Sequence, residues 1–526
     1  MNNIKLLLAL LLYVPALCSA QTATENYVKT VTMLDADGTD SLQAVQYYNG
    51  LGYPTLSVAT AGTDGGTACT LTTYDGAGRE KRRYLPVPAN GLEYIPVNGV
   101  TSMGLFYLDD GFFTESHYDA LDRVTAVDIA GDTWRQAGKQ DRTEHLANTL
   151  SDLVLHYEAP EDGSYSLTLP ENTAFEYYPE GTLAKAVSYD ADNRSTAVFT
   201  DLTGKKIMER TAAGDTYYVY NDLGQLRFVL TPAYNKISRD KAIFAYEYRY
   251  DNRGRVVWKR MPGAECVQYW YDSADRVAYM RDTALGNRYR FCLYDRFGRL
   301  CVQGTCSDGN RDGSVLSATS YTSGSGGVCS TGYSAPYSIS DPQLEIVNYY
   351  DTYEFIGNNI TSAMPALTIG QEQRQHAIGY LTGQVVYATG GEALGTVTVY
   401  DRKGQAVRCV RKGLGGRLED VVTAYTFTGA VDSTEVHAGV GYGSDFMAKT
   451  SYTYQYGKKT KMSLSVRHGA STQSRETGYV YDAIGRLERK ERQLTRTSKS
   501  MCSYTYDVHG WLKSVSSGGF REDLYY

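Results

Sequence analysis

The segment Tyr294-Asp295-Arg296-Phe297-Gly298-Arg299-Leu300 decides the fold, because variants of it recur in the same frame along the chain. Each variant begins with Tyr-Asp, and nearly all have a residue that tolerates a left-handed backbone four places after the tyrosine. Arginine and then an aliphatic residue follow in most of them. The closest variants lie about 20 to 25 residues apart, a period typical of repeat proteins. The tyrosines that begin them are Tyr74, Tyr118, Tyr189, Tyr250, Tyr271, Tyr294, Tyr350, Tyr400, Tyr481 and Tyr506.

The order of residues within one repeat predicts a β-hairpin. Aspartate at the first place and glycine at the fourth are typical of a type I turn that ends in a left-handed bulge residue. The resulting three-residue loop places Asp295 opposite Arg299 and Tyr294 opposite Leu300. A two-residue loop would place the tyrosine opposite the arginine and lose both pairings. We therefore predict antiparallel hairpins with a tyrosine–aliphatic inner face and an ion-paired outer face.

The predicted fold class is all-β. A single hairpin is marginally stable in water, so we expect repeated antiparallel hairpins to extend one another into a larger sheet. The 47 tyrosines and 52 glycines among 526 residues favour strands and tight turns over helices. The expected organisation is a signal peptide at 1–20, a β-rich region at 21–115, repeats at 116–310, a Ser/Gly/Thr-rich loop at 311–345 and a second repeat region at 346–526.

Two local features add to this expectation. Leucines at near-helical spacing predict a helical interruption at Lys139–Leu155. The three-residue loop places Cys292 opposite Val302 and Leu293 opposite Cys301. The two cysteines then project to opposite faces, which makes a disulfide between them geometrically poor.

The residues at the fixed places of the repeat are the candidate site residues, with a structural role. Turn formation and ion pairing explain the aspartates better than paired catalytic carboxylates do, because they recur regularly beside arginine. The candidates are Tyr74, Asp75, Gly78, Tyr118, Asp119, Tyr250, Asp251, Gly254, Arg255, Tyr271, Asp272, Arg276, Tyr294, Asp295, Gly298, Arg299, Tyr400, Asp401, Gly404, Tyr481, Asp482, Gly485, Arg486, Tyr506, Asp507 and Gly510.

The N-terminus has the layout of a secretory signal peptide. One lysine precedes the apolar run Leu6–Leu17, and Cys18-Ser19-Ala20 forms a small-residue cleavage site. No later segment approaches the 18 consecutive apolar residues of a transmembrane helix. We therefore expect a mature chain that begins at Gln21, has no membrane span and is secreted, periplasmic or held at the cell surface.

The sequence lacks the signatures of common catalytic sites. It has no Gly-x-Ser-x-Gly elbow, His-Glu-x-x-His motif or phosphate-binding Gly-x-x-x-x-Gly-Lys loop. A net charge of -7 gives no basic footprint for nucleic acid. These observations predict a protein that is not an enzyme, carries no cofactor and binds no nucleic acid.

One segment has the spacing of a metal loop. Asp308, Asn310 and Asp312, followed by Gly313, match the first half of a calcium-binding loop. Thr319 stands where such a loop needs a bidentate acid, and a turn rich in Asp, Asn and Gly forms without a metal. Calcium binding and a plain turn both remain open.

The repeats Tyr250–Val256 and Tyr294–Leu300 resemble the YD repeat of the Rhs family. The stretch 261–265 and the opening 26–30 are most similar to exported Bacteroidetes YD-repeat proteins. In the family such repeats coil into a large β-sheet shell that can enclose a C-terminal polypeptide, often a toxin. Rhs proteins usually continue into a core segment and a variable C-terminal domain, whereas this chain ends within repeat sequence at Leu524-Tyr525-Tyr526. The resemblance thus implies repeated antiparallel β-hairpins that form a curved or coiling YD-repeat sheet, and we expect this chain to form a partial shell with an unpaired sheet edge.

The resemblance implies an exported scaffold that encloses, presents or binds another polypeptide, with a link to Rhs-type toxin delivery or intercellular competition. The implied partner is a polypeptide cargo or a C-terminal effector. The alternative is a cell-surface adhesion module whose exposed tyrosine-rich faces bind glycans or proteins.

Overall fold

The computed structural model describes residues 22, 24–160, 166–169, 176–307, 316–322, 326–356, 365, 367–388, 392–440, 446–495 and 498–526. The expected signal peptide and the calcium candidates Asp308, Asn310 and Asp312 lie outside the described residues. Antiparallel strands make up most of the described chain, which confirms the all-β prediction. The chain divides into two compact units: Met1–Gln140, Tyr452–Met462 and Arg475–Tyr526 form the first, and Asp141–Ser451 with Ser463–Ser474 forms the second.

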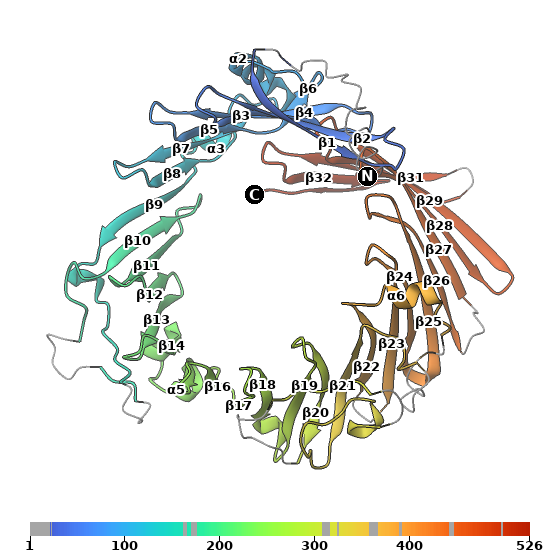
Figure 1. Cartoon of the computed structure of the whole chain (residues 1–526). Helices are drawn as coiled ribbons and strands as arrows, with labels where there is room; N and C mark the ends of the chain where they lie inside the picture. Colours follow the sequence, from blue (N-terminus) through green and yellow to red (C-terminus); the bar gives the residue numbers. More distant parts are fainter. Residues whose placement is uncertain are drawn as a thin grey trace, which may run out of the picture. The chain divides into compact units, whose positions relative to one another are not determined.

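The first unit combines strands from both ends of the sequence (Figure 1). Its N-terminal elements are β1 (Asn26–Met33), β2 (Ser41–Tyr48), β3 (Pro54–Thr60), β4 (Thr67–Tyr74), β5 (Glu80–Tyr84), β6 (Val87–Ala89), α2 (Val97–Thr101), η1 (Ser102–Phe106), β7 (Phe113–Tyr118), β8 (Val124–Asp128) and α3 (Asp132–Gln136). Its C-terminal strands are β30 (Leu487–Gln493), β31 (Lys499–Tyr506), β32 (Leu512–Ser517) and β33 (Phe520–Asp523). Residues of β27 (Phe446–Gln455), β28 (Lys458–His468) and β29 (Ser471–Tyr481) are divided between the units.

The second unit is a run of hairpins that pair in chain order from β10 to β26, side by side in Figure 1. Its strands are β9 (Gln140–Ala147, from Asp141 on), β10 (Ala184–Tyr189), β11 (Ser195–Thr200), β12 (Lys206–Thr211), β13 (Gly214–Tyr220), β14 (Leu226–Leu230), β15 (Ala245–Tyr250), β16 (Val256–Arg260), β17 (Cys266–Tyr271), β18 (Val277–Asp282), β19 (Tyr289–Tyr294), β20 (Leu300–Cys306), β21 (Gln343–Tyr350), β22 (Leu381–Tyr387), β23 (Ala393–Tyr400), β24 (Ala406–Lys412), β25 (Arg417–Tyr425) and β26 (Val431–Val440). Its short helical elements are η2 (Leu150–Asp152), α4 (Pro232–Lys236), α5 (Lys241–Phe244), η3 (Thr283–Leu285), η4 (Val328–Ser330), α6 (Gln371–Gln375) and η6 (Leu414–Gly416).

The predicted hairpin register is correct for the tyrosine next to the turn and wrong from the preceding residue of the same strand onward. Tyr294 lies opposite Leu300, as expected, but Leu293 lies opposite Val302 and Cys292 opposite Gln303. The expected pairs Cys292 with Val302 and Leu293 with Cys301 were therefore wrong. The cause is a β-bulge directly before the tyrosine, in which Cys301 is the extra residue.

The predicted helical interruption at Lys139–Leu155 was also wrong. Residues of β9 pair in antiparallel fashion with β10, and only the 3-10 turn η2 follows. Leu146, Leu150 and Leu153 are exposed, so the leucines do not share a buried face. Their near-helical spacing was coincidental.

Within the part of the chain that the structure describes, three hydrophobic clusters stabilise the sheets, and each joins residues of the hairpin strands to a largely irregular segment packed on them. In the first unit, the strand residues Val45, Leu56 and Leu71 pack with Val87, Val100 and Phe112 of the 85–112 segment. In the second unit, Phe199 and Phe228 pack with Val154 and Tyr157, and Phe291 and Val347 pack with Val328, Tyr333 and Phe355. The described part of the Ser/Gly/Thr-rich stretch 311–345 is thus packed on the sheet.

Strands β16 and β17 lie between the two clusters of the second unit, flanked by β14–β15 and β18–β19 (Figure 1). No residue from 248 to 271 is buried, although these strands carry Trp258, Tyr269 and Trp270. Here the sheet is a single layer whose two faces both contact solvent. Further along the sheet on either side, β14 and β19 bury at least every second residue.

We expect Cys292 and Cys301 to remain free thiols. Cys301 lies in the core cluster, whereas Cys292 is outside it, near the charges of Arg290 and Glu345. Burial also raises the pKa of both thiols to about 11, which disfavours the thiolate needed for disulfide formation. Mass spectrometry after mild oxidation of the native protein should find no peptide that links them. Unfolded protein is the positive control, and a native crosslink would contradict the register.

Candidate functional site: the turn edge of the repeats

Each turn is held by the carboxylate of its aspartate. In the repeat that begins at Tyr250, Oδ1 of Asp251 accepts hydrogen bonds from the backbone N–H of Arg253 (2.9 Å) and Arg255 (3.0 Å). The backbone closes the loop, because Asp251 N–H donates to the Arg255 carbonyl and Gly254 N–H donates to the Asp251 carbonyl. Gly254 has φ 78°, the left-handed conformation that the sequence predicts.

The arginine of the turn pairs with the same aspartate through its side chain. Nε of Arg255 donates to Oδ2 of Asp251 at 2.7 Å. The predicted pairing of the turn aspartate with the turn arginine is therefore confirmed in six repeats, whereas the nearest Arg194–Asp190 distance in the repeat at Tyr189 is 3.8 Å. The equivalent Nε–Oδ2 distances are 2.8 Å for Arg79–Asp75, 2.7 Å for Arg123–Asp119, 2.9 Å for Arg276–Asp272, 2.6 Å for Arg299–Asp295 and 2.7 Å for Arg486–Asp482.

The same arginines also reach the following repeat, a contact that the sequence did not predict. Nη1 of Arg255 donates to Oδ1 of Asp275, the left-handed residue of the next turn, at 2.5 Å, and Arg79 donates to Asp122 at 2.6 Å. Five of these guanidinium groups also lie over the ring of the next repeat tyrosine. The distances from Cζ to the ring centroid are 4.6 Å for Arg79–Tyr118, 4.6 Å for Arg255–Tyr271, 4.7 Å for Arg276–Tyr294, 4.4 Å for Arg299–Tyr350 and 4.8 Å for Arg486–Tyr506.

The tyrosine hydroxyl completes the contact in the opposite direction. Tyr271 donates at 2.6 Å to the carbonyl of Val256, the first residue of the second strand of the preceding hairpin. Phenylalanine could not do this, which explains why the repeat uses tyrosine. The same bond joins Tyr74 to Pro54, Tyr118 to Glu80, Tyr250 to Leu226, Tyr294 to Val277, Tyr350 to Leu300, Tyr400 to Leu381, Tyr425 to Ala406, Tyr481 to Lys459 and Tyr506 to Leu487.

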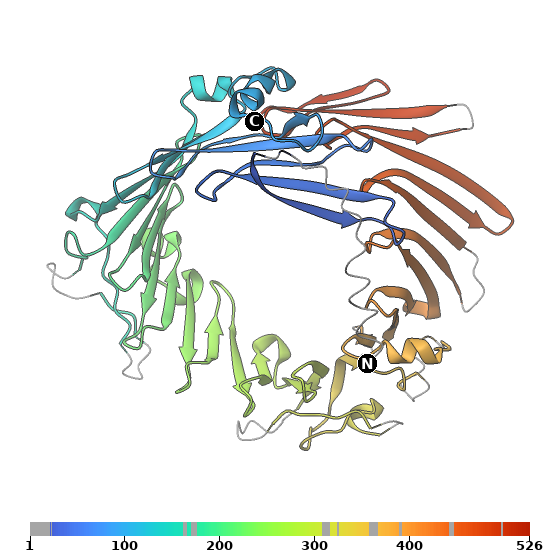
Figure 2. The same cartoon turned by 45° about the horizontal axis from the view of Figure 1, so that its top comes forward.

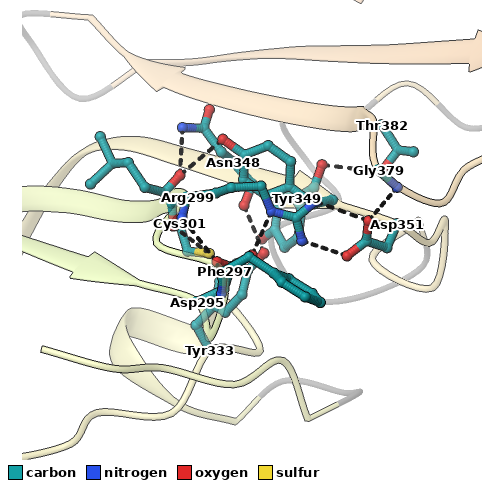
Figure 3. A network of polar contacts seen from close by, with 12 residues as sticks. Asp295, Phe297, Arg299, Cys301, Tyr333, Asn348, Tyr349, Asp351, Gly379 and Thr382 are labelled. Carbon is teal, nitrogen blue, oxygen red and sulfur yellow. Dashed lines mark hydrogen bonds and ion pairs between the residues drawn. The ribbon is translucent and has the colours of Figure 1, made fainter. Parts of the chain in front are cut away.

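The repeat at Tyr350 shows how a long insertion is attached (Figure 3). The sequence frame places Glu354 at the left-handed position, but the turn closes at Gly379, which has φ 91°. Asp351 accepts the Gly379 N–H at 2.7 Å and donates its own N–H to Tyr380. Residues 352–378 are thus an insertion within one turn. Because fixed spacing cannot detect an insertion, the sequence frame failed here.

Arg299 connects this inserted turn to the regular one before it. Its Nε binds Asp295, and its two Nη atoms bind the Asp351 carboxylate at 3.0 and 2.5 Å. Figure 3 shows the guanidinium between these two carboxylates. The hydrogen bonds to Asp351 and Asp295 raise the pKa of Arg299 despite its desolvation, and the hydrogen bond from Arg299 lowers the pKa of Asp351.

The remaining predicted residues occupy the same kind of turn with fewer partners. Asp401 accepts the backbone N–H of Lys403 and Gln405, and Gly404 has φ 77°. Asp507 accepts Trp511 N–H at 2.8 Å, and Gly510 has φ 82°. Two further turns of this geometry were missed, at Asp201–Lys205 and Thr426–Ala430. Glycine at the same offset, at 204 and 429, was the signal that could have identified them.

This arrangement is suited to holding strands in register. Six turn carboxylates of the described chain accept hydrogen bonds both from the backbone of their own turn and from an arginine side chain. They are those of Asp75, Asp119, Asp251, Asp272, Asp295 and Asp482. Within the described residues there is no group of three or more metal-ligating side chains. Nor does the described part of the chain contain a helix long and apolar enough to cross a membrane.

Comparisons with known proteins give one family match and several structural ones. Residues 20–147 match a domain of unknown function, DUF6443. A crystal structure of TcdB2-TccC3 without its hypervariable C-terminal region is 15% identical with a TM-score of 0.44, covering 97% of this chain and 25% of that chain. A Tc holotoxin pore from Photorhabdus luminescens is 14% identical with a TM-score of 0.42, covering 93% of this chain and 24% of that chain. This chain thus spans about a quarter of their length, and no curated protein matches its sequence.

Replacing Arg299 by glutamine should destabilise the protein far more than the same change at Arg194. The Arg299 side chain is 24% exposed and donates hydrogen bonds to two carboxylates, whereas the Arg194 side chain is 78% exposed and lies 3.8 Å from Asp190 and 3.4 Å from Asp192. We expect a loss of roughly 1–3 kcal/mol for Arg299→Gln and less than about 0.5 kcal/mol for Arg194→Gln. Urea unfolding measures both, with hydrogen exchange of β19–β22 as the local readout. Equal effects would contradict the bridging role.

Acidification below about pH 4 should destabilise the turns. Hydrogen bonds from the backbone and side chain of Arg79 lower the pKa of Asp75 from its ordinary 3.8, and those from Arg276 lower the pKa of Asp272 in spite of burial. A carboxyl group with a lowered folded pKa adds stability above its unfolded pKa, and this is lost as pH falls through the folded pKa. Thermal unfolding from pH 6 to pH 2 measures the loss. Asp272→Asn should reduce it, and an unchanged profile would contradict the assignment.

Proposed function

We propose that this chain is an exported, non-enzymatic YD-repeat scaffold of the Rhs kind that encloses, presents or binds another polypeptide. The proposal includes a role in toxin delivery or in competition between cells. It is supported by the repeat sequence and by contacts that connect each hairpin to the next.

The observation that carries a binding role is the uncovered part of the sheet at β16 and β17, together with the adjoining end of β15 from Tyr248 on. By register, Tyr248, Lys259 and Val267 share one face of the sheet, and Tyr269 lies on the same face two residues further along β17. These side chains are half-buried, and no irregular segment of the described chain packs over them in a core cluster. Aromatic surface that is uncovered on a sheet held in register is typical of an interaction site. A polypeptide would gain both aromatic contacts and polar contacts there.

The test is protection of a polypeptide by the full chain. The chain is produced together with the polypeptide encoded beside it, and trypsin digestion of that polypeptide is followed by mass spectrometry. Digestion should slow markedly with the chain present, and hydrogen exchange of β15–β18 should slow in the complex. Tyr248→Ser with Tyr269→Ser should abolish protection, whereas the exposed turn control Leu202→Ser should not.

Digestion at the same rate with and without the chain would contradict the scaffold role. Binding in a glycan array without protection of any polypeptide would favour the adhesion module instead.

Export is a separate prediction of the proposed function. The apolar run Leu6–Leu17 and the small residues Cys18-Ser19-Ala20 predict cleavage before Gln21. Intact-mass measurement of the protein recovered outside the cytoplasm should give a chain that begins at Gln21. A chain that retains Met1 there would contradict the prediction.

A further inference from the structure

A pocket of about 520 Å³ lies in the first unit, where the turn between β31 and β32 meets the segments around α3. Its volume falls within the range of small-ligand pockets. Figure 2 shows the C-terminal end of the chain beside the N-terminal helices of this unit. The residues that line the pocket and enter the argument are Phe106, Tyr107, Asp109, Trp134, Arg486, Tyr506, Asp507, His509, Lys513 and Tyr525.

The pocket exists because the 507–511 turn is docked on the N-terminal segment. His509, 8% exposed, places Nε2 2.8 Å from the Ala130 carbonyl and Nδ1 3.1 Å from Asp507. Val508 packs on the hydrophobic cluster of the first unit. A side chain at Gly131 would come within 3.1 Å of Val508, so the close approach needs glycine. The walls are therefore fixed by packing.

Aromatic rings supply the apolar surface of the pocket and its rim. Trp134 contacts His509 (centroid distance 4.8 Å) and Trp511 (5.6 Å), and Trp511 contacts Tyr526 at 5.0 Å. Tyr525, which lines the pocket, is 92% exposed, so its ring remains open to a ligand. Exposed aromatic rings beside polar groups suit a ligand that is apolar on one face and polar at its edge.

The polar groups of the pocket carry both signs of charge. Asp109 and Asp507 supply acceptors, while Lys513 and Arg486 supply donors. In other repeats the arginine of one turn binds the left-handed residue of the following turn, which is Asp122 for Arg79 and Asp275 for Arg255. The turn that follows Arg486 has Gly510 at this place, so it offers Arg486 no carboxylate there. Its buried Nη1 has no hydrogen-bond partner among the described residues. The balance of charge favours a neutral ligand that both donates and accepts hydrogen bonds over a polyanion or polycation.

We propose that this pocket binds a neutral saccharide, whose ring packs its C–H face on Trp134 or Tyr525 and directs hydroxyls to Asp109, Asp507 and Lys513. A pyranose ring has an apolar face and an edge of hydroxyls that donate and accept, which matches the two kinds of surface here. The site is independent of the polypeptide scaffold role, because it lies in the other unit from β15–β18.

The experiment uses the full chain with maltotetraose, cellotetraose and mannotetraose as probes, and saturation-transfer NMR and calorimetry as readouts. At least one should bind, and Tyr525→Ala and Lys513→Ala should each weaken binding about tenfold. Both side chains are exposed, so the fold should survive their removal. The matched controls Phe520→Ala and Lys29→Ala remove exposed side chains outside the pocket and should leave affinity within about twofold.

Three results would overturn the proposal: no binding of any neutral tetrasaccharide, equal loss in the pocket variants and the controls, or binding only of a heparin tetrasaccharide or a glutamate-rich peptide. Protection of a polypeptide by the chain would be unaffected by any of them, so the two proposals fail separately.

Discussion

The other contacts of the repeats depend on an aspartate carboxylate that accepts hydrogen bonds from its own turn. In the Asp251 turn this carboxylate binds the backbone of Arg253 and Arg255 and also the Arg255 guanidinium. It therefore fixes the loop and the direction of the arginine together. An arginine held in this direction lies over the tyrosine of the next hairpin, and that tyrosine donates its hydroxyl back to the preceding strand. Each repeat is thus stabilised mainly by its nearest neighbours, as in other repeat proteins.

This nearest-neighbour stabilisation explains how β16 and β17 remain ordered without a buried core. A sheet of one layer gains little from burial, so its register must be specified by other means. The turn of Asp251 and the bond from Tyr271 to Val256 supply that specification at the edge of the sheet. Where the irregular segments cover the sheet, hydrophobic packing adds to the same contacts. The repeats can therefore leave both faces of β16 and β17 uncovered without losing strand order.

The sequence predicted the local structure where a residue type has one physical role, as in the turns. It did not predict contacts whose geometry is set by neighbouring hairpins. Tyr294 opposite Leu300 followed from turn chemistry, because aspartate and a left-handed residue define the loop. The bulge at Cys301 was missed, because no residue type in the repeat marks it, although the same register shift directly precedes the tyrosine in other repeats. The partner of Asp351 lies beyond a long insertion, so the fixed spacing leads to Glu354, the exception at this place of the repeat, and not to Gly379. The contacts of the arginines with the next turn were also missed, because they depend on how neighbouring hairpins are placed beside one another.

The two residues between the aspartate and the left-handed position are the ones that vary between repeats, and they carry the specific contacts. In the 507–510 turn they are Val508 and His509, which dock on Ala130 and the core of the first unit. In the Asp251 turn, by contrast, Arg253 at this place binds Asp275 of the next turn. The fixed residues maintain the hairpin, so these two places can change without disturbing it. In a repeat of this kind, different residues therefore stabilise the hairpin and make the contacts that are specific to that repeat. The specific contacts arise at the turn.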